Sequence, residues 1–123
     1  MELKLSNLNK TWIFDIDGTI VKHNGYKIDG YDTILDNAKN FFDNIPADDM
    51  IILVTSRTDE YRKVTEDFLH SNGIRYNHII YNAPYGERIL VNDKKPSGLN
   101  MAYAISTNRD EFITDSIVID NSL

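Results

Sequence analysis

The stretch Trp12–Ile20 constrains the fold most, because an apolar run ends there in two carboxylates. Residues 11–16 have the length and the aromatic and β-branched content of a buried strand. Asp15 and Asp17 are two residues apart, so in strand geometry they point the same way. Buried carboxylates need a cation, hydrogen-bond donors or a proton, and Gly18 lets the chain turn out of the strand. We therefore predict an active site at this strand end, built for a metal ion and a phosphate.

Two later segments repeat the pattern of an apolar run followed by polar groups. Residues 50–54 predict a second buried strand, which ends in Thr55-Ser56-Arg57. Residues 88–91 predict another strand, which ends in Asn92-Asp93-Lys94-Lys95. In open α/β sheets, ligands bind at the carboxyl ends of parallel strands. We therefore expect these polar groups to meet near the two aspartates.

The remaining segments predict alternating helices and strands. Apolar spacing predicts a helix over about residues 34–45, started by Asp29 or Asp32, and a second helix from Thr58 to near Gly73. Further predictions are strands over 78–81, 102–105 and 116–119, a hairpin over 20–28 and a polar lead-in over 1–10. This order implies right-handed crossovers. We expect a three-layer, Rossmann-like α/β fold with a mainly parallel sheet, helices on both faces and no cap domain.

Length and composition bound the function. The chain has 123 residues, of which 41% are hydrophobic and 26% charged, so we expect one domain over residues 1–123. A net charge of −6 argues against a nucleic-acid partner, since no basic excess would neutralise phosphates. The sequence has no cysteine, which excludes disulfides and thiolate zinc sites. It also has no membrane-length apolar run and no signal-peptide core, so we expect a cytoplasmic protein without membrane contact.

The polar strand ends suit phosphate chemistry with a divalent cation. Magnesium prefers oxygen ligands, which Asp15 together with Asp93 or Asn92 would supply. With the phosphate charge neutralised, a carboxylate can attack it and form an aspartyl-phosphate. The neighbouring acid can protonate the leaving oxygen and later deprotonate a water. The candidate phosphate-binding residues are Thr55, Ser56, Arg57, Lys94 and Lys95.

The sequence Phe14-Asp15-Ile16-Asp17-Gly18-Thr19 resembles the D-x-D-G-T signature of the haloacid dehalogenase (HAD) superfamily, in its phosphatase branch. Residues 52–57 resemble the family's second motif, and residues 90–93 its fourth, acidic motif. The resemblance implies that Asp15 is the nucleophile and a metal ligand. It implies that Asp17 is the general acid/base, with its backbone carbonyl on the metal. It further implies that Thr55 binds phosphate and that Asp93, with Asn92, holds Mg²⁺.

The chain departs from the family pattern at two positions. The family's third motif is a lysine, but no lysine lies between Lys63 and Asp93, so Lys94 or Lys95 is expected to replace it. The fourth motif begins with Asn92, where members often have an acid. The resemblance to small uncapped phosphatases of polysaccharide pathways implies a phosphorylated sugar or related metabolite as substrate. It also implies an open site, which a homo-oligomer would cover.

Two other functions stay open. A phospho-accepting receiver module is also small, acidic and α/β, and it also uses carboxylates, a hydroxyl and a lysine, although its acids are ordered differently. A non-catalytic relative that binds a phosphorylated ligand would account for Asn92 and for the missing lysine. His23, His70 and His78 show no spacing typical of metal ligands, and we interpret them as surface or structural residues.

Overall fold

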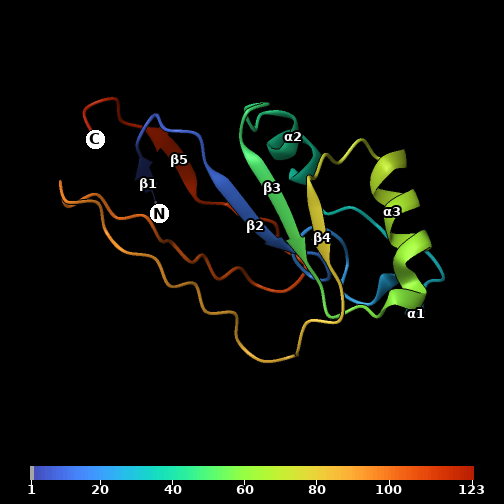
Figure 1. The fold of residues 1–123 in the computed structure, drawn as a ribbon. Coiled ribbons are helices and arrows are strands. Elements are labelled where there is room, and N and C mark those ends of the chain that lie inside the picture. The colour runs from blue at the N-terminus through green and yellow to red at the C-terminus, as the bar shows by residue number, and fades with distance from the viewer. Residues whose placement is uncertain (1) are drawn as a thin grey trace. The chain divides into compact units, whose positions relative to one another are not determined.

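The computed structural model describes residues 2–123 and has an α/β fold with parallel strands (Figure 1). It divides into two compact units. The larger unit comprises Asn9–Pro84 and Thr107–Ile113, and the smaller unit comprises the residues up to Leu8, Tyr85–Ser106 and Thr114–Leu123. The elements are β1 (Glu2–Leu5), β2 (Thr11–Asp15), α1 (Gly25–Ile28), α2 (Ala38–Asp43), β3 (Met50–Val54), the 3-10 helix η1 (Asp59–Tyr61), α3 (Arg62–Ser71), β4 (His78–Ile80) and β5 (Ser116–Ile119).

A three-stranded parallel sheet in the order β2-β3-β4 forms the centre of the larger unit. The three arrows point the same way in Figure 1. The pairing places Asp15, Val54 and Ile80 in one row at the carboxyl ends of the strands. The polar residues that follow β2 and β3 therefore leave the sheet at the same edge, as the sequence predicts.

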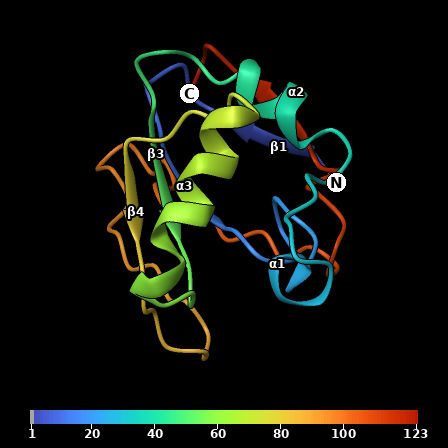
Figure 2. The same ribbon diagram turned by 90° about the vertical axis from the view of Figure 1, so that its right-hand side faces the viewer.

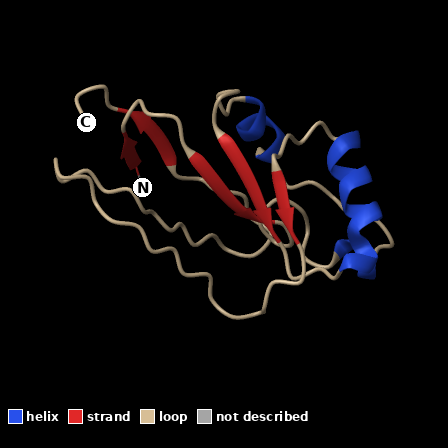
Figure 3. Cartoon of the chain, in the orientation of Figure 1, coloured by secondary structure: helices blue, strands red, loops and turns tan. Residues whose placement is uncertain are grey.

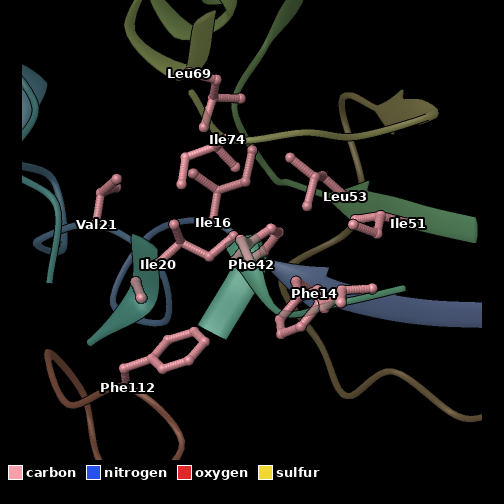
Figure 4. Close-up of a cluster of buried hydrophobic side chains, with 12 residues drawn as sticks. Phe14, Ile16, Ile20, Val21, Phe42, Ile51, Leu53, Leu69, Ile74 and Phe112 are labelled. Carbon is pink, nitrogen blue, oxygen red and sulfur yellow. The ribbon is translucent and has the colours of Figure 1, made fainter. Parts of the chain in front are cut away.

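The core of the larger unit lies on one face of this sheet. Side chains alternate between the faces of a strand, so Phe14, Ile51 and Leu53 point the same way, and all three are buried. Helices α2 and α3 add Phe42 and Leu69 to the same cluster (Figure 4). Figure 2 shows α1, α2 and α3 on one side of β3 and β4.

The opposite face of the sheet is more open. Ile13 of β2, Met50 of β3 and Ile80 of β4 all lie on it with exposed side chains. The sequence predicted helices on both faces of the sheet. Within residues 2–123, helices α2 and α3 pack on the face that carries the core. The α/β class and the mainly parallel pairing are confirmed.

A buried carboxylate ties the start of β2 to the start of β3. Asp49 accepts hydrogen bonds from Trp12 Nε1 at 2.9 Å, from Asn9 Nδ2 at 3.0 Å and from the Lys10 N–H at 3.0 Å. Burial acts to raise the pKa of Asp49, but the hydrogen bonds outweigh it, and the pKa lies below its usual value. Asp49 therefore stabilises the fold as a carboxylate.

The smaller unit is built around a two-stranded parallel sheet, in which β1 pairs with β5. Its longest segment, Tyr85–Ser106, contains neither helix nor strand (Figure 3). Gly98 closes a turn there, with its N–H donating to the Lys95 carbonyl at 2.8 Å. Whether the two units act as the single domain predicted from the sequence stays a prediction. Within residues 2–123, none of the helices has the length and apolar content needed to cross a membrane.

Two strand predictions are wrong. Residues 88–91 and 102–105 form no strand and lie in the long segment of the smaller unit. A β-prone run becomes a strand only where a neighbouring strand completes its hydrogen bonds. The predicted lead-in over residues 1–10 instead contains β1, which is the partner of the correctly predicted strand over 116–119.

The first predicted helix was too long, whereas the second is confirmed by η1 and α3, which together cover the chain from Asp59 to Ser71. Helix α2 covers only Ala38–Asp43, because Asn37 has a φ of 69°, a left-handed conformation through which a helix cannot run. Asp32 caps no helix and is instead buried against Arg57. The segment 20–28 contains the short helix α1 where a hairpin was predicted. Gly73, with a φ of 65°, follows α3 as predicted.

The Ile51→Ala substitution should destabilise the protein far more than Ile13→Ala. Both shorten an isoleucine of the central sheet, but Ile51 is 0% exposed and Ile13 is 53% exposed. Removing a buried isoleucine side chain costs about 2–5 kcal/mol, and the half-exposed site should lose clearly less. Urea unfolding followed by circular dichroism measures the difference. Equal losses would contradict the one-sided core.

The Asp49→Asn variant should be less stable than the wild type at pH 7 by about 1–3 kcal/mol, because an amide cannot accept the three hydrogen bonds as a carboxylate does. The folded-state pKa of Asp49 is lowered. Its stabilisation is therefore full above the unfolded value of about 3.9 and is lost as the pH falls through the folded value. Urea unfolding between pH 7 and pH 3 should show the two proteins converge. Asp48→Asn, at the exposed neighbour, is the control, and a gap that stays constant with pH would overturn the assignment.

Candidate functional site

A tight turn follows β2 and contains Gly18. The N–H groups of Ile20 and Val21 donate to the Ile16 carbonyl at 2.9 and 3.1 Å, so the chain folds back directly after the strand. Gly18 has a φ of 80°, a left-handed conformation that a side chain disfavours. The glycine of the sequence motif is therefore required by the shape of the turn.

The two aspartates of this turn bind different partners. Asp15, half-buried at the end of β2, accepts a hydrogen bond from Thr19 Oγ1 at 3.1 Å. Asp17 forms a bidentate salt bridge with Arg57, in which Arg57 Nε donates to Asp17 Oδ2 at 3.0 Å and Arg57 Nη2 donates to Asp17 Oδ1 at 2.9 Å. The motif spacing alone did not distinguish the two carboxylates, and their partners do.

Arg57 is the centre of a buried polar cluster, with a side chain that is 1% exposed. Its Nη1 and Nη2 donate to Asp32 at 3.1 and 2.7 Å, and Nη1 also donates to Thr65 Oγ1 at 2.8 Å. The guanidinium carbon lies 3.9 Å from the ring centre of Tyr26. Together with the two bonds to Asp17, these contacts use all five N–H groups of the guanidinium.

The partners of Arg57 keep it charged. Burial acts to lower the pKa of Arg57, but its hydrogen bonds to Asp17 and Asp32 and their charges outweigh burial, so the pKa is raised. Sequence reasoning proposed Arg57 as a phosphate-binding residue. In the structure its N–H groups are all engaged, and the side chain holds Asp17 in place instead.

Sequence reasoning missed three partners of this cluster: Asp32, Thr65 and Tyr26. Asp32 was assigned only as a possible helix cap, although a buried arginine also needs carboxylate partners. Thr65 lies on α3 and Tyr26 on α1, so contacts with Arg57 arise only when both helices pack beside the end of β3. No local pattern indicates such contacts.

Thr55 and Ser56 follow β3 at the sheet edge where β2 ends in Asp15. Thr55 is fully buried, and its Oγ1 accepts a hydrogen bond from the Arg57 N–H at 3.0 Å. Ser56 Oγ donates to the Pro84 carbonyl at 3.4 Å. These hydroxyls shape the chain after β3, and their binding of phosphate stays a prediction.

The other predicted site residues, Asn92, Asp93, Lys94 and Lys95, belong to the smaller unit. They lie in its exposed segment without helix or strand. Asn92 Nδ2 donates to the Asp93 carbonyl at 3.0 Å. Lys94 borders a hollow that is also lined by residues 97–100, Tyr103, Ser122 and Leu123. Their grouping with Asp15 and Asp17 stays a prediction.

The larger unit offers donors that fit a magnesium ion. Asp15 and Asp17 supply hard oxygen atoms at a strand end, and Mg²⁺ is commonly held by one or two protein carboxylates together with water. Arg57 binds both carboxylate oxygens of Asp17. The donor of Asp17 that the family resemblance implies is its backbone carbonyl, which this pairing with Arg57 does not involve. Within residues 2–123, no group of three or more acidic or histidine side chains is arranged as a metal site.

A second segment contacts the turn after β2. The N–H of Asp110, in Thr107–Ile113, donates to the Gly18 carbonyl at 2.8 Å. The N–H of His23 donates to Asp110 Oδ1 at 2.7 Å. Sequence analysis gave this segment no role.

Comparisons with known proteins bear on the fold. The sequence matches no family model and no curated protein. A chain of a solved Pnkp1/Rnl/Hen1 complex is similar in structure, with a TM-score of 0.52 and 25% sequence identity. The match covers 68% of this chain and 31% of that chain, so this chain spans about a third of its length. The likeness supports the α/β fold.

The Arg57→Met variant should lose about 3–5 kcal/mol of stability, because the carboxylates of Asp17 and Asp32 would lose their shared buried cation. The matched control is Arg62→Met, which removes an exposed guanidinium paired with Asp59 and should change stability little. Urea unfolding at pH 7 measures both variants. If Arg57→Met unfolds at the same urea concentration as the wild type, the cluster does not stabilise the fold in this way.

Proposed function

We propose that this protein is a magnesium-dependent phosphomonoesterase of the HAD type, which acts through an aspartyl-phosphate. The observation that carries the proposal is the different environment of the two motif aspartates. Asp15 ends β2 beside the hydroxyl of Thr19, whereas Asp17 is held by Arg57. This chemistry needs one carboxylate as nucleophile and another as proton carrier.

In the proposed reaction, a carboxylate oxygen of Asp15 bonds to the phosphorus while the bond to the leaving oxygen breaks. The hydrogen bond from Thr19 limits rotation of the Asp15 carboxylate, which favours attack from one orientation. Water then attacks the phosphorus of the aspartyl-phosphate, and the Asp15 carboxylate is released with inorganic phosphate.

Asp17 carries the proton in both steps. A carboxylate has about four lone-pair positions, and Arg57 uses one on each oxygen, which leaves positions for a proton. Asp17 protonates the leaving oxygen in the first step and takes a proton from the attacking water in the second. Because Arg57 keeps its charge, it holds the Asp17 side chain in one place throughout.

Magnesium, when bound, would neutralise phosphate charge and polarise the phosphorus–oxygen bonds. The proposed ligands in the larger unit are the Asp15 carboxylate and the Asp17 backbone carbonyl, both hard oxygen donors. Asn92 and Asp93 stay predicted ligands from the family resemblance.

The proposed substrate is a small phosphorylated metabolite, such as a sugar phosphate, and the proposed location is the cytoplasm. The net charge of −6 supports a small molecule over a nucleic acid. A sequence without cysteine suits a reducing compartment. A homo-oligomer that covers the site is part of the same proposal.

A second candidate function is the binding of a phosphorylated ligand without turnover. The observation that favours it is the pairing of both Asp17 oxygens with Arg57. A carboxylate engaged in this way suits a structural ion pair as well as a proton carrier. The two candidates differ in whether the bound phosphate ester is hydrolysed.

The Asp15→Asn variant should lower kcat for p-nitrophenyl phosphate by about a thousandfold or more, because it removes the nucleophile. Asp17→Asn should lower kcat by about 10²–10⁴-fold, because it removes the proton carrier. Phosphate release is measured with magnesium, after chelation, and after magnesium is restored, on this ester and on a panel of sugar phosphates. Asp48→Asn, at an exposed site before β3, is the control and should retain activity.

Two outcomes would decide against the phosphatase. If the wild type hydrolyses none of the esters but binds inorganic phosphate, the non-catalytic candidate is favoured. If Asp15→Asn turns over as fast as the wild type, Asp15 is not the nucleophile.

A further inference from the structure

An arginine that sequence analysis left unassigned lies against the turn that carries both aspartates. It belongs to Thr107–Ile113, which is part of the larger unit. A Cβ placed on Gly18 would lie 3.3 Å from Cγ of Arg109, so the Arg109 side chain packs directly on this glycine. The same imaginary Cβ would lie 3.6 Å from Cβ of His23. Arg109 therefore flanks the turn between Asp15 and Thr19.

The backbone around Arg109 is held by specific bonds. The next residue, Asp110, donates its N–H to the Gly18 carbonyl at 2.8 Å and accepts the His23 N–H at 2.7 Å. Asp110 has a φ of 66°, a left-handed conformation that is uncommon outside glycine. The two hydrogen bonds of Asp110 hold the backbone in this conformation, and the conformation sets the direction of the neighbouring Arg109 side chain.

The core fixes the same segment from its other side. Phe112 is buried, with its ring centre 5.3 Å from that of Phe41 and 6.3 Å from that of Phe14. Figure 4 shows Phe112 in the cluster with Phe42 and Phe14. The segment that carries Arg109 is therefore held on one side by Phe112 in the core and on the other by the turn that contains Gly18.

The guanidinium of Arg109 is available to a ligand. Arg109 is exposed, and within residues 2–123 it makes no hydrogen bond or ion pair. The other cations near this turn are engaged: Arg57 uses all its N–H groups, and Lys27 lies 5.6 Å from the ring centres of both Tyr26 and Tyr61. An unpaired, permanently charged guanidinium matches the oxygens of a phosphate group through two parallel hydrogen bonds.

We propose that Arg109 binds the phosphate group of the substrate at the Gly18 turn and supplies the positive charge that sequence analysis expected from Lys94 or Lys95. The inference rests on the proposed function and deepens it, since it assigns the recognition of a phosphate dianion to a named side chain. A phosphate bound at the Gly18 turn would lie within reach of the Arg109 side chain, which packs on that glycine. The arginine offsets the repulsion between phosphate and the two carboxylates.

The test measures binding of inorganic phosphate to the full chain by titration calorimetry, with magnesium present. Arg109→Gln should weaken phosphate binding by about ten- to a hundredfold, the range of a hydrogen-bonded charge pair. Arg109→Lys keeps the charge and should recover part of the loss. In parallel, Arg109→Gln should raise KM for p-nitrophenyl phosphate more than it lowers kcat, because the contact forms with the bound substrate.

Two matched controls separate Arg109 from general charge effects. Lys63→Gln removes a charge from the exposed surface of α3, where Lys63 pairs with Asp67, and should leave phosphate binding unchanged. The double variant Lys94→Gln/Lys95→Gln tests the alternative cations. If the double variant loses phosphate binding and Arg109→Gln does not, the proposal is overturned, and equal losses in Arg109→Gln and Lys63→Gln overturn it as well.

The outcomes distinguish this inference from the proposed function. If the wild type binds phosphate through Arg109 but hydrolyses no ester, the inference holds and the phosphatase proposal fails. If the wild type hydrolyses esters and Arg109→Gln behaves like it, the phosphatase holds and the inference fails. A wild type that neither binds phosphate nor turns over an ester overturns both.

Discussion

The buried guanidinium of Arg57 is the interaction on which the site depends. It joins the turn after β2 through Asp17, the segment before α2 through Asp32, and α3 through Thr65. Two carboxylates without this cation would face each other in a largely buried space, at a high cost in free energy. Because all five N–H groups have partners, the cluster favours one arrangement of these segments over others.

That arrangement gives the two motif aspartates different roles. Asp17 is turned toward Arg57, whereas Asp15 stays at the strand end beside Thr19. Arg57, which the sequence suggested as a phosphate-binding residue, is therefore a structural residue that holds Asp17 in place. Arg109, an exposed cation from a distant part of the chain, packs on the turn instead, and this exchange of roles between two arginines underlies the proposed phosphate site.

Much of the larger unit could be predicted from local patterns. The strands over residues 11–15, 50–54 and 78–80 are short apolar runs bounded by polar residues, and such runs are stable only inside a sheet. The run over 88–91 is also apolar but has no paired strand, and whether such a run forms a strand depends on the neighbours that it meets. The strand β1 was missed because it has few apolar residues, and its pairing with the distant strand β5 is not visible in the local sequence.

The sequence by itself determined the turn after β2, with its two aspartates. Gly18 is the residue that a left-handed turn requires, and Asp15 and Asp17 are placed on either side of Ile16 by the chain itself. Only the tertiary structure decided what each side chain does there. Arg57, which binds the Asp17 carboxylate, lies 40 residues away from it in the sequence, and Arg109 comes from beyond residue 106. Hydrogen bonds and ion pairs depend on distance in space, which local sequence patterns do not encode.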